Sequence, residues 1–112
     1  MSARNATREH FGITEKSFDL IVKSISVRPE IERALIFGSR AMGNARQGSD
    51  IDLALYGEKV TRATAEALSR ELNERVPIPY YVDVVAYRDI DHDELKRHID
   101  IEGREFFRRE NR

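Results

Sequence analysis

Three short apolar runs limit most strongly how this chain can fold. They cover residues 34–37, 51–56 and 81–87, and the first two end at Gly38 and Gly57. Each run is shorter than a typical helix and is bounded by turn-forming residues, and the last is rich in β-branched and aromatic side chains. The pattern predicts three strands, the first of which is buried and leads into a turn and a short helix.

Segments with helical periodicity separate and flank the expected strands. A first helix is expected to begin after Thr14, which can cap its N-terminus, and to end before Pro29. A second helix is expected between Thr61 and the turn marked by Pro77 and Pro79. The apolar faces of these two helices are formed by Phe18, Ile21, Val22 and Ile25, and by Ala65, Leu68, Leu72 and Val76.

The C-terminal part of the chain is expected to be helical as well. The pattern starts near Asp91, runs through residues 92–99 and extends over residues 103–110. In that last segment Phe106 and Phe107 stand between charged residues. We expect a final helix that packs these two aromatic side chains on the core.

The order of these elements predicts an α/β (α+β) fold, a small mixed β-sheet packed against helices. The chain has 112 residues, which is the size of one ordinary domain. We therefore expect a single domain over residues 1–112. Residues 1–12 are polar and irregular and are expected to be flexible.

Composition excludes several classes of protein. The chain contains no cysteine, so disulfides and thiolate metal sites are excluded. Its formal net charge is -1, so no basic field draws it to DNA. No apolar run reaches the length of a membrane span, and the N-terminal residues lack the apolar core of a signal peptide. We expect a cytoplasmic globular protein with no membrane and no DNA partner.

Two aspartates stand one residue apart at the start of the second expected strand. Because side chains alternate across a strand, Asp50 and Asp52 share one face while the apolar residues beside them face the core. By the same alternation, Val82 and Val84 of the third strand face the core and Asp83 lies on the other face of that strand. If these two strands are neighbours, the three carboxylates converge on one patch.

Three ionised carboxylates in one place repel each other unless cations share the site. Hard divalent cations prefer oxygen ligands, and Mg²⁺ is commonly held by one or two carboxylates together with substrate phosphates. A pair of such ions can clamp the attacking and leaving oxygens of a phosphoryl displacement. We therefore expect Asp50, Asp52 and Asp83 to be the metal ligands and the catalytic residues.

The segment between the first two expected strands is a candidate phosphate site. Gly38 lets the backbone approach a ligand closely, Ser39 adds hydroxyl and amide donors, and Arg40 adds positive charge. Ser49 is the fourth residue expected to bind the cofactor, and it is also expected to shape the turn before the aspartates or to hydrogen-bond a carboxylate. The two G-x-x-x-x-G spacings of this segment are not followed by the lysine of a P-loop.

Histidine and tyrosine add little to this site at the level of sequence. His10, His92 and His98 are scattered without the spacing of a metal site, and we expect them to be surface or packing residues. Tyr80 or Tyr81 could stack on a base, but nothing in the sequence selects either of them.

These motifs together resemble the nucleotidyltransferase superfamily that includes DNA polymerase β. The resemblance is carried by GS at 38–39, GSDIDLAL at 48–55 and VDVV at 82–85. The short length and the spacing are similar to those of the minimal nucleotidyltransferases, the MNT group. The resemblance implies a polymerase β-like nucleotidyltransferase fold.

The resemblance also implies a role for each motif. Gly38 and Ser39 would bind the β- and γ-phosphates of a nucleoside triphosphate. Asp50 and Asp52 would hold two Mg²⁺ ions, and Asp83 would complete the shell of the catalytic metal and help activate the incoming hydroxyl. The reaction would transfer a nucleoside monophosphate, AMP where ATP is the donor, and release pyrophosphate.

The resemblance further suggests a partner. Minimal members of the family are similar to antitoxins that attach AMP units to a HEPN-domain ribonuclease toxin, which implies a HEPN toxin as acceptor and a homo-oligomer or hetero-oligomer as the assembly. Two alternatives stay open. The same chemistry could act on a small hydroxylated molecule, or an antitoxin without catalysis could neutralise its partner by binding.

Overall fold

A computed structural model describes residues 10–46 and 48–110 of the chain. Of the residues expected to be flexible, 1–9 lie outside the described residues, whereas 10–12 lead through a turn in which the Phe11 ring stacks on Phe106. The elements follow in the order α2 (Glu15–Ser26), β1 (Arg33–Phe37), β2 (Ile51–Tyr56), α3 (Arg62–Glu74), β3 (Val82–Ala86), the short 3₁₀ helix η1 (Tyr87–Asp89), α4 (Asp93–Glu102) and β4 (Arg104–Arg108).

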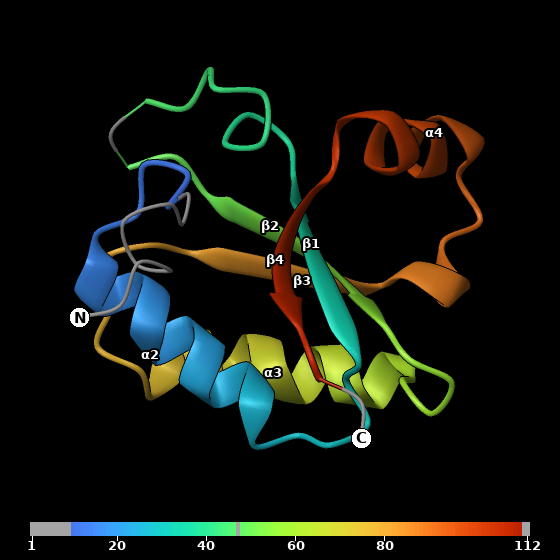
Figure 1. The fold of residues 1–112 in the computed structure, drawn as a ribbon, viewed down its shortest axis with the longest axis horizontal. Coiled ribbons are helices and arrows are strands. Elements are labelled where there is room, and N and C mark those ends of the chain that lie inside the picture. Colours follow the sequence, from blue (N-terminus) through green and yellow to red (C-terminus); the bar gives the residue numbers. More distant parts are fainter. Residues whose placement is uncertain (1–9, 47, 111–112) are drawn as a thin grey trace.

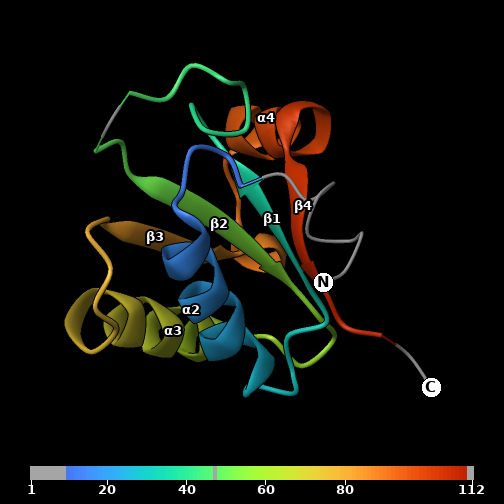
Figure 2. The same cartoon turned by 60° about the vertical axis from the view of Figure 1, so that its left-hand side comes forward.

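The strands form one mixed sheet in the order β3-β2-β1-β4. β1 is antiparallel to both β2 and β4, and β2 is parallel to β3. α2 and α3 lie on one side of the sheet and α4 lies on the other, as Figures 1 and 2 show from two directions. The predicted small mixed sheet packed against helices is confirmed. None of the helices in the described residues is long and apolar enough to cross a lipid bilayer.

Local sequence explains where α2 and α3 begin. The Thr14 side chain accepts a hydrogen bond from the Ser17 amide over 3.3 Å. Thr61 and Thr64 form a reciprocal capping box at the start of α3. Both helices therefore begin at the caps that the sequence predicts, and β1, β2 and β3 agree with the three predicted strands to within one residue at each end.

The short helix expected after Gly38 is absent, because residues 38–43 form consecutive turns. Gly38 and Gly43 both have a φ of +79°, which lies outside the helical region. The Asn44 amide donates to the Ser39 carbonyl over 2.9 Å and closes the segment. The prediction of a helix is wrong because two left-handed glycines bound a segment that is too short to continue as one.

The helix expected over residues 103–110 is also wrong, since α4 ends at Glu102 and β4 follows. β4 pairs antiparallel with β1, and Arg33 lies opposite Arg108. Without β4 this edge of β1 would expose amide and carbonyl groups that need partners, and a strand satisfies them whereas a helix does not. Phe106 still packs on the core, and its ring centroid lies 4.4 Å from that of Phe18.

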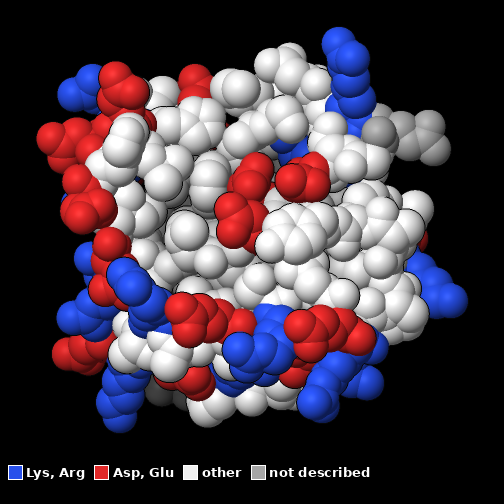
Figure 3. All heavy atoms as spheres, turned by 180° about the vertical axis from the view of Figure 1, so that it is seen from behind, with Lys and Arg blue, Asp and Glu red and all other residues white. Residues whose placement is uncertain are grey.

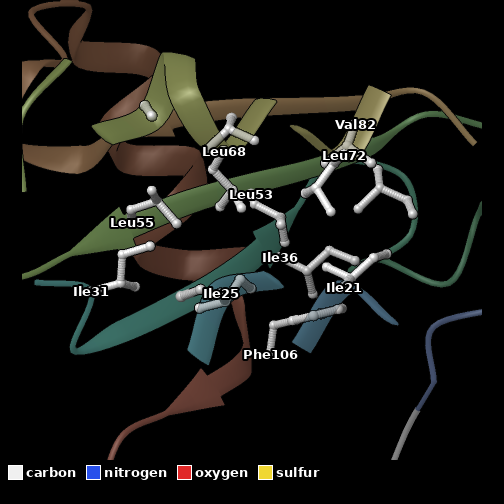
Figure 4. Close-up of a cluster of buried hydrophobic side chains, with 14 of the residues drawn as sticks. Ile21, Ile25, Ile31, Ile36, Leu53, Leu55, Leu68, Leu72, Val82 and Phe106 are labelled. Carbon is white, nitrogen blue, oxygen red and sulfur yellow. The ribbon is translucent and has the colours of Figure 1, made fainter. Parts of the chain in front are cut away.

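Two apolar clusters lie on the two faces of the sheet. The smaller cluster joins α4 to the sheet through Ile99, which packs with Leu35, Phe37 and Ala54. Neighbouring residues of β2 thus face different layers, because Leu53 belongs to the larger cluster. In that larger cluster, between the sheet, α2 and α3, Figure 4 shows the buried side chains pointing toward one another, among them Ile21, Ile25, Ile36, Leu55, Leu68, Leu72 and Phe106.

Candidate active site

The acidic residues lie near the starts of β2 and β3, on the side of the sheet that carries α4. In this parallel pair of strands Asp52 is directly opposite Asp83. Asp52 is on the same side of β2 as Ala54, which packs toward α4, whereas Leu53 points into the larger cluster. The condition that the sequence left open, that the two strands are neighbours, is therefore met, and Asp52 and Asp83 lie side by side.

Asp52 is the most enclosed of the three acids, because it is half-buried while Asp50 and Asp83 are exposed. Burial raises the pKa of Asp52 above its ordinary value, the negative charges of Asp83 and Asp50 raise it further, and His98 acts in the opposite direction. Figure 3 shows acidic side chains gathered among uncharged atoms near the middle of the face seen from behind. A cation at Asp52 would therefore relieve both the repulsion and the cost of burial.

The carboxylates fit a hard divalent cation that protein and substrate hold jointly. Within residues 10–46 and 48–110, no group of three or more His, Asp and Glu side chains is arranged to hold a metal ion by itself. The facing pair Asp52 and Asp83 offers only oxygen donors, and Mg²⁺ is commonly bound by one or two carboxylates plus substrate phosphates. The residues present fit Mg²⁺ that binds together with a nucleotide.

The turn after β1 touches this acidic pair. A Cβ built on Gly38 would lie 2.5 Å from Oδ2 of Asp52, so a larger residue would require the turn or the Asp52 carboxylate to shift. Glycine lets the backbone approach the carboxylate this closely in its present position. On its other side, the Gly38 amide donates a hydrogen bond to Nε2 of His98 over 3.0 Å. The turn, β2 and α4 meet at Gly38.

The other residues predicted to bind the cofactor, Ser39, Arg40 and Ser49, lie in the segment between β1 and β2. Ser39 closes the turn through its carbonyl. Arg40 is buried, and its guanidinium donates to the carbonyls of Ser49 and Phe11. The Ser49 hydroxyl accepts from the Arg46 amide over 2.9 Å. Arg40 and Ser49 thus bond to protein groups and hold the shape of the segment.

Sequence reasoning missed His98, which it assigned to the surface or to packing. α4 carries Leu95, His98 and Ile99 at helical spacing, and Leu95 and Ile99 pack in the smaller cluster. That spacing could have revealed His98 in the sequence. His98 is three positions after Leu95 and next to Ile99, so it lies on the helix face that points toward the sheet. The His98 ring lies edge-on to Phe37, with centroids 6.0 Å apart.

A hollow of about 420 Å³ lies beside β3, and of the three acids only Asp83 lines it. Asn73 shapes its wall, because its carboxamide hydrogen-bonds to both the amide and the carbonyl of Val82 over 2.8 Å. Of the two tyrosines, Tyr81 is exposed at the hollow, whereas the Tyr80 hydroxyl accepts from the Thr14 amide. The lining comes from α3 and β3: Glu66, Ser69, Arg70, Asn73, Glu74, Tyr81, Asp83 and Val84.

Comparison with known protein families identifies the family of the chain. The sequence profile described as "Polymerase beta, Nucleotidyltransferase" matches residues 19–112. The chain belongs to this family. The match spans the Gly38 turn, both acidic strands and α4. Among curated protein sequences, none matches the chain.

Solved structures share the fold of this nucleotidyltransferase. A toxin–antitoxin complex with AMP-PNP has a TM-score of 0.67 and 21% identity, over 82% of this chain and 73% of the other. A tri-AMPylated HEPN toxin of Shewanella oneidensis in complex with MNT antitoxin has a TM-score of 0.63 and 18% identity, over 85% and 72%. A putative nucleotidyltransferase from Sulfolobus solfataricus has a TM-score of 0.52 and 20% identity, over 83% and 78%.

Proposed function

We propose that this nucleotidyltransferase moves AMP from ATP to a hydroxyl group of a partner protein in the cytoplasm, as the antitoxin of a HEPN toxin with which it assembles. The observation that carries the proposal is that Gly38 lies against Asp52 while Asp52 lies opposite Asp83. A candidate phosphate-binding turn and two carboxylates that attract cations therefore meet at one point. The similar structures with AMP-PNP and with an AMPylated toxin support the choice of nucleotide and of partner.

Each residue has a distinct role in this proposal. Ser39 donates to the β- and γ-phosphates of ATP, and Gly38, whose own amide donates to His98, lets the backbone of the turn approach those phosphates closely. Asp50, Asp52 and Asp83 are the residues that would hold two Mg²⁺ ions, which when bound neutralise charge on the phosphates. Asp83, exposed beside the hollow, orients the acceptor hydroxyl and takes its proton. The hydroxyl oxygen forms a bond to the α-phosphorus, the bond from that phosphorus to the pyrophosphate oxygen breaks, and pyrophosphate leaves.

The test is the transfer of label from α-labelled ATP to a co-expressed HEPN toxin. We expect Asp50→Asn combined with Asp52→Asn to reduce labelling by more than about a hundredfold. Loss of a group that only orients a metal ligand typically lowers activity by about 10- to 100-fold, and loss of the ligand itself should lower activity further. Asp91→Asn removes an exposed carboxylate outside the site and should label like the wild type. Chelation of divalent cations should abolish labelling, and added Mg²⁺ should restore it.

The same variants separate the proposal from its alternatives. If the double variant still protects cells fully from the toxin, neutralisation by binding explains the biology and catalysis is incidental. A labelled product of low mass, with the toxin unlabelled, would indicate a small hydroxylated acceptor. The proposal of nucleotidyl transfer fails if no protein, RNA or small molecule accepts label from the wild-type protein.

A further inference from the structure

A hydrogen bond joins α4 to the turn after β1. The Gly38 amide donates to Nε2 of His98 over 3.0 Å, although the two residues are 60 positions apart in the chain. Because Nε2 accepts from the amide, the ring proton in this arrangement lies on Nδ1. The Gly38 amide is thus bonded to a helix that follows Asp50, Asp52 and Asp83 in the sequence.

Both ends of this hydrogen bond are held in place. On the helix side, Ile99 is fully buried beside His98, and the His98 ring packs edge-on against Phe37 at the end of β1. On the turn side, Gly38 has a left-handed φ and lies against Asp52. A hydrogen bond between two restrained groups sets their separation, so loss of the acceptor would release the turn from α4.

We propose that His98 is a positioning residue of the nucleotide site, which holds the Gly38 turn against Asp52 so that the donors of the turn and the carboxylates of β2 and β3 face one nucleoside triphosphate. The identity of this ligand rests on the proposed function, whereas the hydrogen bond itself can be measured without a ligand. His98 acts through Gly38 and leaves the reacting atoms to the aspartates.

Three substitutions isolate this hydrogen bond. In His98→Gln the carboxamide oxygen reaches the position of Nε2 and can accept from the same amide. His98→Leu has comparable bulk and no acceptor. His92→Asn is the matched control, because His92 caps the same helix by accepting from the Leu95 amide, and asparagine is a favourable N-cap.

The first measurement needs no nucleotide and no metal. Hydrogen exchange of the Gly38 amide, followed by NMR in the free protein, should be slow in the wild type and in His98→Gln. It should be about tenfold faster in His98→Leu, because the hydrogen bond that protects the amide is gone. If the Gly38 amide exchanges equally fast in the wild type and in His98→Leu, His98 does not hold the turn and the proposal is overturned.

The second measurement is the affinity for AMP-PNP with Mg²⁺, together with KM and kcat for ATP. We expect His98→Leu to raise the dissociation constant and KM about five- to tenfold, the effect of one hydrogen bond, with a smaller change in kcat. His98→Gln should return both values close to those of the wild type, and His92→Asn should leave them unchanged. A merely structural role of His98 would lower the folded fraction without this split and without rescue by glutamine.

Two outcomes overturn the proposal at this stage. Unchanged affinity in His98→Leu would show that the turn binds nucleotide without help from α4. Tighter binding in His98→Leu would show that the imidazole competes with the phosphates for the Gly38 amide. If the wild type itself binds no nucleotide, the proposed function fails, and the exchange rate of the Gly38 amide then decides by itself whether His98 holds the turn.

Discussion

Gly38 shows at the scale of a single residue how the backbone and the site constrain each other. Its φ of +79° strains any other residue, and the space that a Cβ would take is filled by Oδ2 of Asp52. Gly43 has the same φ, but nothing lies within 4 Å of the Cβ that an alanine would add. A substitution at Gly43 therefore tests backbone strain alone, whereas a substitution at Gly38 tests both backbone strain and the close contact with Asp52.

We expect Gly38→Ala and Gly43→Ala each to lower the free energy of unfolding by about 1–2 kcal/mol, because alanine is strained in the left-handed region. Gly38→Ala should also lose nucleotide binding, since its methyl group displaces either the turn or Asp52. Urea unfolding measures the first effect and titration with AMP-PNP the second. Equal nucleotide affinity in the two variants would contradict a functional contact between Gly38 and Asp52.

At the scale of elements, α2 and α3 are joined by a polar link centred on Glu71. The Ser24 hydroxyl donates to Oε2 of Glu71 over 2.5 Å, and Nη2 of Arg28 donates to Oε1 over 2.9 Å. The hydrogen bond from Ser24, and then that from Arg28, lowers the pKa of Glu71 below its ordinary value. The ionised carboxylate is therefore the form that joins the two helices.

A lowered pKa in the folded state means that this link stabilises the fold above the pKa of the unfolded state and is lost as the pH falls through the folded-state pKa. We expect Glu71→Gln to reduce the free energy of unfolding by about 0.5–1 kcal/mol at neutral pH, the range for a partly exposed ion pair. The reduction should shrink at about pH 3, because this lies below the usual pKa of a glutamate in the unfolded chain.

Urea unfolding of the wild type and of Glu71→Gln at the two pH values checks this dependence. Glu74→Gln, at the exposed end of the same helix, removes a carboxylate without these partners and should change the free energy of unfolding little at either pH. A difference between the wild type and Glu71→Gln that grows as the pH falls would contradict the assigned direction of the pKa shift.

At the scale of the whole molecule, the sheet separates a larger apolar layer from a smaller one. Ile25 of α2 belongs to the larger cluster and Ile99 of α4 to the smaller, and both side chains are fully buried. The acidic pair lies on the side of the smaller cluster. Stability therefore depends mostly on one face of the sheet, whereas the arrangement of the site depends on the other.

Ile25→Ala and Ile99→Ala should each reduce the free energy of unfolding by about 2–5 kcal/mol, because each leaves a cavity. Only Ile99→Ala should also weaken AMP-PNP binding by the folded protein, since it loosens α4 and with it His98. Calorimetric titration well below the unfolding temperature measures this contrast. The pair Ile25→Val and Ile99→Val gives the same comparison at about 0.5–1.5 kcal/mol each if the alanine variants do not fold.

Elements with a strong local signal could be predicted from the sequence. The strand over residues 51–56 follows from an apolar run that ends at glycine, and the caps at Thr14 and Thr61 follow from their hydroxyl groups. Residues 104–108 carry no comparable signal, because adjacent aromatic residues suit a helix face and a strand equally. Residues 104–108 form a strand because they pair with the edge of β1, whose amide and carbonyl groups would otherwise lack partners.

The sequence by itself determined that Asp52 and Asp83 point away from the larger core, because alternation along a strand is set by covalent geometry. Only the tertiary structure decided that β2 and β3 are parallel neighbours, that α4 packs on the acidic side of the sheet, and that His98 reaches Gly38. These contacts join residues far apart in the chain. Each of these segments has several possible partners, and the free energy of the whole packed molecule decides which of them is chosen. A local sequence pattern does not contain the information needed to compare those free energies.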